Sequence, residues 1–138
     1  MNNKIYQKLF NVQKKIKELV KDEENKFQRY LYFNEYQVLT KLKPLLTEEN
    51  LVLTFSDVEN EFVYEKMEKE YLVRYLKKAI LTNSENAEEQ LVYYFWAIGS
   101  NTDPAKAKGA AETYAIRYFL SKFFLMPVTD ETDPDVWK

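Results

Sequence analysis

A strand and a long helix follow each other in LVYYFWAIGSNTDPAKAKGAAETYAIRYFL, residues 91–120. The first part of this stretch, residues 91–98, is apolar and rich in aromatic and branched side chains, a composition typical of β-strands. Because apolar side chains fall on both faces of this strand, we expect it to be central in its sheet and covered on both sides.

The helix in this stretch has clear start signals. Either Thr102 or Asp103 can accept a hydrogen bond from the free N–H groups of the first turn, and Pro104 suits the first helical position. Pro127 cannot continue a helix, so we expect the helix over about residues 104–125.

Two further strands are expected upstream of this stretch. Residues 51–57 begin with an apolar alternating run, and residues 71–81 form the strongest strand pattern of the chain. A turn is expected at 58–61. The polar segment 82–90 is expected to be the loop of a hairpin whose second strand is 91–98.

The N-terminal part of the chain predicts two helices. Residues 4–21 place apolar side chains at spacings of three and four, and a second helix is expected from a cap at Asn34 to about Leu46, with Pro44 near its end. The aromatic segment 27–33 between them suits either a strand or an ordered loop. This order predicts an α+β domain with a curved antiparallel sheet and helices packed on one side.

Composition narrows the possible functions. The chain has 138 residues, 46 % hydrophobic and 30 % charged, so we expect a single domain over 1–126 and a short acidic tail over 127–138. Histidine and cysteine are absent, which removes the commonest general base, disulfides and thiolate metal sites. There is no long apolar run and no signal-peptide pattern, so we expect an intracellular protein.

Charge is distributed unevenly along the chain. The net charge is −2, but residues 101–126 carry four basic and two acidic side chains. At about 100° per residue, Lys106, Thr113 and Arg117 fall on one stripe of the last helix, flanked by Tyr114 and Tyr118. Phosphate binding depends on such local basic patches rather than on the overall charge.

The basic stripe has two interpretations. Arg117 can pair with a carboxylate in the core or extend its head to water, which would be a structural role. Alternatively, its fork of donors binds phosphate while the tyrosines stack on bases. Within 71–81, Arg74 and Lys78 share one strand face and Lys77 lies on the other. These cations are either a solvated surface or further phosphate contacts.

The last helix also resembles a motif of the ERF family, the essential-recombination-function proteins of phages. The usual form of that motif is close to G-S-A-x-T-Y-x-R-R-Y-x-L, followed by an acidic stretch. The residues that carry the resemblance are Gly109, Thr113, Tyr114, Arg117, Tyr118 and Leu120. The acidic segment 129–133 and KPLLTEENLVL at 43–53 also look like the family. The chain departs from the motif at Ile116, where the family often has a second arginine, and at Ala110, where it often has serine.

The resemblance implies single-strand annealing in phage recombination. ERF-like proteins bind single-stranded DNA, assemble into rings or helical filaments and pair complementary strands without ATP. It also implies a β-β-β-α core, similar to that of the eukaryotic ring-forming annealing mediators. That core would comprise residues 51–57, 71–81, 91–98 and 104–125.

The implied partners are single-stranded DNA, further copies of the chain in a homo-oligomer, and a phage exonuclease or single-strand-binding protein. We expect no enzymatic activity, no cofactor and no metal, and a location in the cytoplasm of the bacterial host. The residues expected to contact DNA are Arg117, Arg74, Lys78, Lys106, Lys108, Lys122, Thr113, Tyr114 and Tyr118.

Two other functions are compatible with the sequence. The acidic side chains Asp130, Glu131, Asp133 and Asp135 are ligands that Mg²⁺ accepts, as in a nuclease. Alternatively, the amphipathic helices and the Trp137 tail dock a partner of a recombination or replication complex, without any DNA binding by the chain itself.

Overall fold

The protein is an α+β protein, as predicted. The computed structural model describes residues 4–24 and 35–126, with the side chains of 17–24 and 35 left out. The elements are, in chain order, α1 (Ile5–Glu24), α2 (Glu35–Glu48), β1 (Leu51–Lys66), β2 (Tyr71–Asn83), β3 (Asn86–Asn101) and α3 (Pro104–Phe123). The aromatic segment 27–33 and the tail 127–138 lie outside the described residues.

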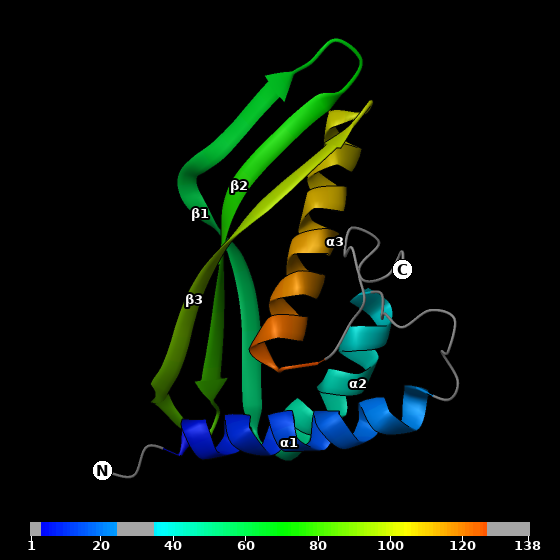
Figure 1. Ribbon diagram of the computed structural model, residues 1–138. Coiled ribbons are helices and arrows are strands. Elements are labelled where there is room, and N and C mark those ends of the chain that lie inside the picture. Colours follow the sequence, from blue (N-terminus) through cyan, green and yellow to red (C-terminus); the bar gives the residue numbers. More distant parts are fainter. Residues whose placement is uncertain (1–3, 25–34, 127–138) are drawn as a thin grey trace.

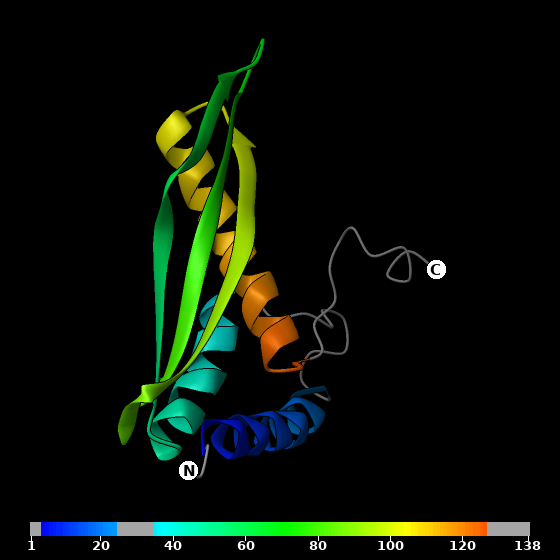
Figure 2. The same cartoon turned by 90° about the vertical axis from the view of Figure 1, so that its left-hand side faces the viewer.

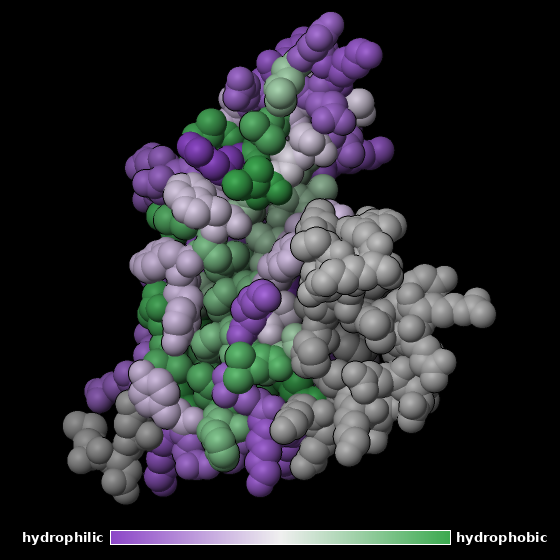
Figure 3. Space-filling model, in the orientation of Figure 1, coloured by the Kyte–Doolittle hydropathy of each residue, from purple (hydrophilic) through white to green (hydrophobic). Residues whose placement is uncertain are grey.

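The three strands form one antiparallel sheet in the order β1-β2-β3, so β2 is the central strand. The sheet is strongly twisted, and the helices lie on one side of it, as expected (Figure 1). α3 runs along the sheet against β3 and β2, whereas α1 crosses the base of the molecule. The β1–β2 hairpin extends past the N-terminal end of α3 in both ribbon views (Figures 1 and 2), and hydrophilic side chains surround its tip (Figure 3).

The prediction that residues 91–98 form a central, doubly covered strand is wrong. Within the described chain, β3 pairs with β2 alone and therefore lies at an edge of the sheet. Its face towards α3 contains Leu91 and Ala97, which are buried, but Trp96 and Ile98 on the other face are about half exposed, at 49 % and 55 %. The apolar residues on this second face belong to an open surface, not to a second covered layer.

Two predicted turns are also wrong. The predicted loop 82–90 shrinks to a turn at Ser84 and Glu85, because its polar residues continue the β2–β3 pairing. Polar side chains are tolerated in an exposed antiparallel hairpin, so the polar composition of 82–90 predicted a longer loop than the structure has. At 58–61 the strand does not turn back. Its register with β2 shifts, and Asn60 adopts a positive φ of 66°, which asparagine tolerates better than most residues.

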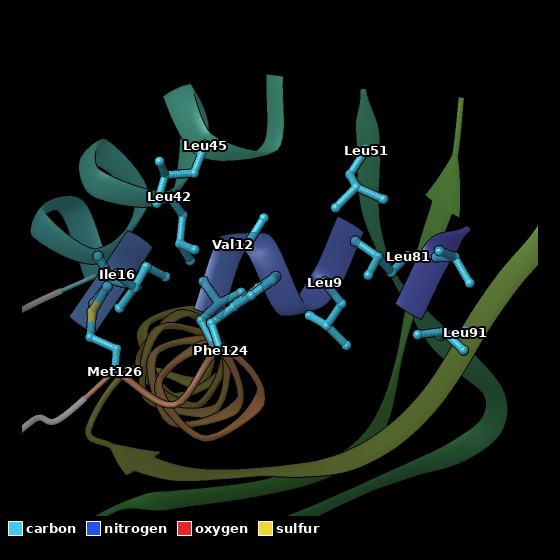
Figure 4. Close-up of a cluster of buried hydrophobic side chains, with 13 residues drawn as sticks. Leu9, Val12, Ile16, Leu42, Leu45, Leu51, Leu81, Leu91, Phe124 and Met126 are labelled. Atoms are coloured by element: carbon cyan, nitrogen blue, oxygen red, sulfur yellow. The ribbon is translucent and has the colours of Figure 1, made fainter. Parts of the chain in front are cut away.

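The main hydrophobic core lies at the base of the molecule, where all three helices meet one end of the sheet (Figure 4). The described part of the predicted apolar stripe of α1, from Ile5 to Ile16, is buried here, and α2 continues without interruption through Pro44. The buried residues of this core are Ile5, Leu9, Val12, Ile16, Val38, Leu42, Leu45, Leu51, Leu81, Leu91, Leu120, Phe124 and Met126.

A second core lies between α3 and the middle of the sheet and is built from small residues. An alanine stripe on α3, Ala107, Ala111 and Ala115, packs on a patch formed by Val73, Tyr75 and Ala97. Because alanine side chains are short, the helix axis can lie close to the strands. This packing fixes which side of α3 faces the sheet and which side faces outward.

The first turn of α1 is held by a carboxylate from the sheet. Glu89 accepts hydrogen bonds from the backbone N–H of Ile5 at 2.9 Å and of Lys4 at 3.3 Å. α1 has no acidic residue in its own first turn, so Glu89 supplies the negative charge that a helix N-terminus favours. The hydrogen bond from Asn83 and these backbone bonds lower the pKa of Glu89, although partial desolvation opposes them.

Candidate nucleic-acid interface

The basic stripe predicted on the last helix lies on the outer side of α3. The helix begins as expected, with the Asp103 carboxylate accepting a hydrogen bond from the Ala105 N–H at 2.9 Å. Since the alanine stripe faces the sheet, the opposite stripe faces outward, where Lys106 and Thr113 are exposed and Arg117 is half-buried.

Arg117 lies against two tyrosine rings on this outer side. Its guanidinium carbon is 4.9 Å from the ring centroid of Tyr114 and 5.2 Å from that of Tyr118. The two rings are nearly parallel, at 20° and 6.4 Å between centroids, and Tyr114 is 53 % exposed. Cation–π contacts of this kind attract a guanidinium to the faces of the rings and orient it there.

The single carboxylate of α3 faces the other way. Glu112 accepts a hydrogen bond at 2.6 Å from Lys77 of β2, which also donates to Asp57 at 2.6 Å and is only 3 % exposed. Desolvation disfavours the charged form of Lys77, but its two carboxylate partners outweigh this and raise its pKa. The negative charge of α3 is therefore paired at the sheet, and the charged side chains that α3 itself places on its outer side, Lys106 and Arg117, are cations.

Lys108 and Lys122 do not join the outer stripe. Lys108 points towards the sheet, where its ammonium lies 3.3 Å from Asp57 and 4.6 Å from the ring centroid of Tyr75. The Tyr75 hydroxyl donates to the backbone carbonyl of Lys108 at 2.9 Å, which ties β2 to this turn of α3. Lys122 is exposed in the last turn of the helix. The ammonium of Lys108 is thus engaged by the chain itself.

Arg74 and Lys78 lie on the opposite face of the sheet from α3. In the register of β2, Val73, Tyr75 and Lys77 face the helix, so Arg74 and Lys78 face away from it. Figure 2 looks onto this open face, with α3 behind the strands. The residues predicted to bind DNA are therefore divided between two surfaces, because the sheet separates Arg74 and Lys78 from the outer side of α3.

The open face also holds aromatic residues that sequence reasoning did not select. Tyr94 is 57 % exposed and Trp96 49 % exposed on β3, and the Arg74 guanidinium carbon lies 5.4 Å from the Trp96 ring centroid. The sequence contained a signal for them, because Tyr94 and Trp96 are two residues apart in 91–98 and therefore lie on the same face of the strand. Because residues 91–98 were expected to be covered on both faces, Tyr94 and Trp96 were not expected to be exposed.

The structure gives the arrangement of the acidic side chains and the length and polarity of the helices for the described residues. Within residues 4–24 and 35–126, no group of three or more acidic side chains is arranged to hold a metal ion. The acidic residues Asp130, Glu131, Asp133 and Asp135 lie outside the described residues. None of the described helices has the length and apolar character needed to cross a membrane.

The fold and this surface define an α+β protein built on a β-β-β-α unit, with a cationic and aromatic helix face. The model of the ERF superfamily matches residues 5–137, nearly the whole chain. The chain therefore belongs to the ERF superfamily, and this membership points to a role in phage recombination. No curated protein and no solved structure matches the chain.

Proposed function

We propose that this protein binds single-stranded DNA and anneals complementary strands without ATP during phage recombination. The observation that supports this function is the outer side of α3. The only carboxylate of the helix, Glu112, is paired with Lys77 at the sheet, whereas Arg117 lies beside two tyrosine rings on the outer side and Lys106 is exposed nearer the start of the helix. Cations beside exposed rings suit a strand that offers both phosphates and unpaired bases.

Each side chain has a distinct task in this proposal. The planar fork of Arg117 donates two hydrogen bonds to one phosphate, and Lys106 and Thr113 contact neighbouring backbone oxygens. The exposed ring of Tyr114 stacks on a base. Annealing breaks no covalent bond, so the function requires no catalytic residue and no cofactor.

Assembly supplies the affinity that one subunit lacks. Copies of the chain in a ring or filament repeat the outer side of α3 along one strand, so each further contact is made at a high effective concentration. A weak single site is then sufficient. The protein acts in the cytoplasm of the bacterial host, alongside a phage exonuclease or single-strand-binding protein.

The experiment compares single- and double-stranded labelled oligonucleotides by fluorescence anisotropy at low salt. It is combined with annealing of complementary oligonucleotides without nucleotide and with native mass spectrometry. Preferential single-strand binding, annealing and a mass of several subunits support the proposal. Absence of binding at low salt would refute it, and would favour the protein-interaction module if a recombination protein is bound instead.

A further inference from the structure

The face of the sheet that points away from α3 is a second surface of unusual composition. No element of the described chain covers it. It contains side chains of β2 and β3 at alternate positions together with those of β1 in register with them. Its exposed large hydrophobic residues are Val52, Val63, Val92, Tyr94, Trp96 and Ile98, each between 42 % and 57 % exposed.

The cations of this face have no carboxylate partner among the described residues. In the register of the sheet, Arg74 lies opposite Val63 and Ile98, and Lys78 lies opposite Ser56 and Tyr94. The one acid at a paired position of this face is Glu65, which lies opposite Leu72 near the hairpin tip. Several lysines elsewhere in the described chain are paired with carboxylates of the chain itself. Lys8, for example, pairs with Glu85, and Lys77 pairs with Asp57 and Glu112. An anionic partner therefore complements the charge of the open face.

The aromatic residues of this face are spaced for flat ligands. Tyr94 and Trp96 are two residues apart on one strand, so their side chains project in the same direction about 7 Å apart. Arg74 lies against the Trp96 ring at 5.4 Å, which restricts the ring and places a cation beside it. Sheet faces with exposed aromatic residues stack unpaired nucleobases, and every base offers a face for such stacking.

We propose that the open sheet face is a second contact surface for single-stranded DNA. Bases stack on Tyr94 and Trp96, while Arg74 and Lys78 bind the adjoining phosphates. This inference rests on the proposed function and adds to it a surface on the far side of the sheet from α3. Because the sheet lies between them, the two surfaces of one subunit contact different segments of nucleic acid.

Charge favours DNA over a second copy of the chain on this face. Two open faces packed together would bring Arg74 and Lys78 of both copies into one contact, where Glu65 is the only carboxylate at the paired positions of each face. The outer side of α3 from a neighbouring copy is cationic as well, with Lys106 and Arg117. Like charges placed together in an interface oppose association.

The test uses the fluorescence of Trp96 itself. The chain has two tryptophans, so Trp137→Phe leaves Trp96 as the single reporter. Unlabelled oligothymidylate, added at low salt, is expected to quench its emission in a saturable way because a stacked base contacts the indole. In parallel, anisotropy of a labelled oligothymidylate is expected to show about tenfold weaker binding for Trp96→Leu and for Tyr94→Leu.

The control is Tyr36→Leu, which removes a tyrosine that is 76 % exposed on α2 and is expected to bind as the unmodified chain does. The inference is overturned if the unmodified chain binds the oligonucleotide by anisotropy but Trp96 emission does not change and Trp96→Leu and Tyr94→Leu bind with unchanged affinity. The proposed function would then remain intact. A drop in native mass on Trp96→Leu also overturns the inference, because a second copy would then cover the face. Absence of any oligonucleotide binding by the unmodified chain refutes the proposed function itself.

Discussion

Gly99 of β3 lies directly against Ala111 of α3, with no room for a side chain between them. A Cβ atom at position 99 would lie 2.8 Å from the backbone nitrogen of Ala111 and 2.9 Å from its Cα. These are backbone atoms of a helix that is held by its own hydrogen bonds, so they cannot yield as a flexible side chain would. The absence of a side chain at Gly99 sets how close α3 comes to the sheet.

We therefore expect Gly99→Ala to destabilise the protein by about 1–3 kcal/mol, the usual cost of forcing an extra methyl group into a packed site. The measurement is the free energy of unfolding from urea titration, followed by circular dichroism. If the variant were as stable as the unmodified chain, the contact between β3 and α3 would be looser than the structure has it.

Gly109→Ala is the matched control, because it makes the same chemical change within α3. No neighbouring atom lies within 4 Å of a Cβ at this position. Alanine favours a helix interior over glycine, so this variant is expected to be more stable by about 0.5–1 kcal/mol. The opposite signs at the two glycines separate the effect of crowding from that of backbone freedom.

Lys77 of β2 is a buried cation that pairs with Asp57 of β1 and with Glu112 of α3. Its replacement is therefore expected to lower the free energy of unfolding. Lys77→Met keeps most of the buried stem but leaves Glu112 without the ammonium and Asp57 with Lys108 alone. Both carboxylates are about 40 % exposed and can be hydrated, so we expect a loss of about 1–3 kcal/mol, below that for a fully buried pair.

Lys15→Met is the comparison for this variant, because Lys15 pairs with Glu48 on an exposed part of the surface. Exposed pairs contribute about 0–1 kcal/mol, so unfolding of this variant should change little. Equal losses in the two variants would show that burial of Lys77 adds nothing to its ion pairs.

The acid side of the stability profile depends on Asp57. Desolvation disfavours its charged form, but the hydrogen bonds and charges of Lys77 and Lys108 outweigh this and lower its pKa below the ordinary value of 3.8. A carboxyl whose pKa is lower in the folded state stabilises the fold above its ordinary pKa, and this contribution is lost as pH falls through the folded value. Glu85 and Glu89, whose pKa values are also lowered, act in the same direction.

We expect the free energy of unfolding to be nearly constant from about pH 5 to pH 8 and to fall below about pH 4. Asp57→Asn should lower stability at neutral pH and make the decrease in acid shallower, as measured by urea unfolding at a series of pH values. A variant that keeps the full acid dependence would mean that Asp57 titrates the same way in the folded and unfolded chains.

Much of the fold could be predicted because it depends on local patterns. The spacing of Ile5 and Leu9 predicts α1, and Asp103 with Pro104 marks the start of α3. The position of β3 at the sheet edge could not be predicted, because the apolar side chains around Trp96 look the same beneath a covering layer as on an open surface.

The candidate site could also be predicted only in part. The stripe around Arg117 follows from helical periodicity, which is local, and the structure has it on one side of α3. The separation of Arg74 from that stripe depends on which face of the sheet α3 covers. That choice is determined by contacts distant in sequence, above all Gly99 against Ala111, and no short-range pattern contains it.

The role of Arg117 in DNA binding leads to a prediction about salt. Each phosphate contact on a single strand contributes about 0.7 to the slope of log affinity against log salt. Arg117→Ala is therefore expected to weaken binding of a labelled single-stranded oligonucleotide about tenfold at low salt and to reduce that slope by about 0.7. Circular dichroism should be unchanged, because the side chain is only half-buried.

Lys14→Ala removes the same charge from the exposed side of α1 and should leave both affinity and slope nearly unchanged. Arg117→Lys should restore the slope but only part of the affinity, since an ammonium keeps the charge and loses the planar fork and the contact with the two tyrosine rings. If Lys14→Ala and Arg117→Ala weaken binding equally, the strand responds to net charge alone and the outer side of α3 is not its binding surface.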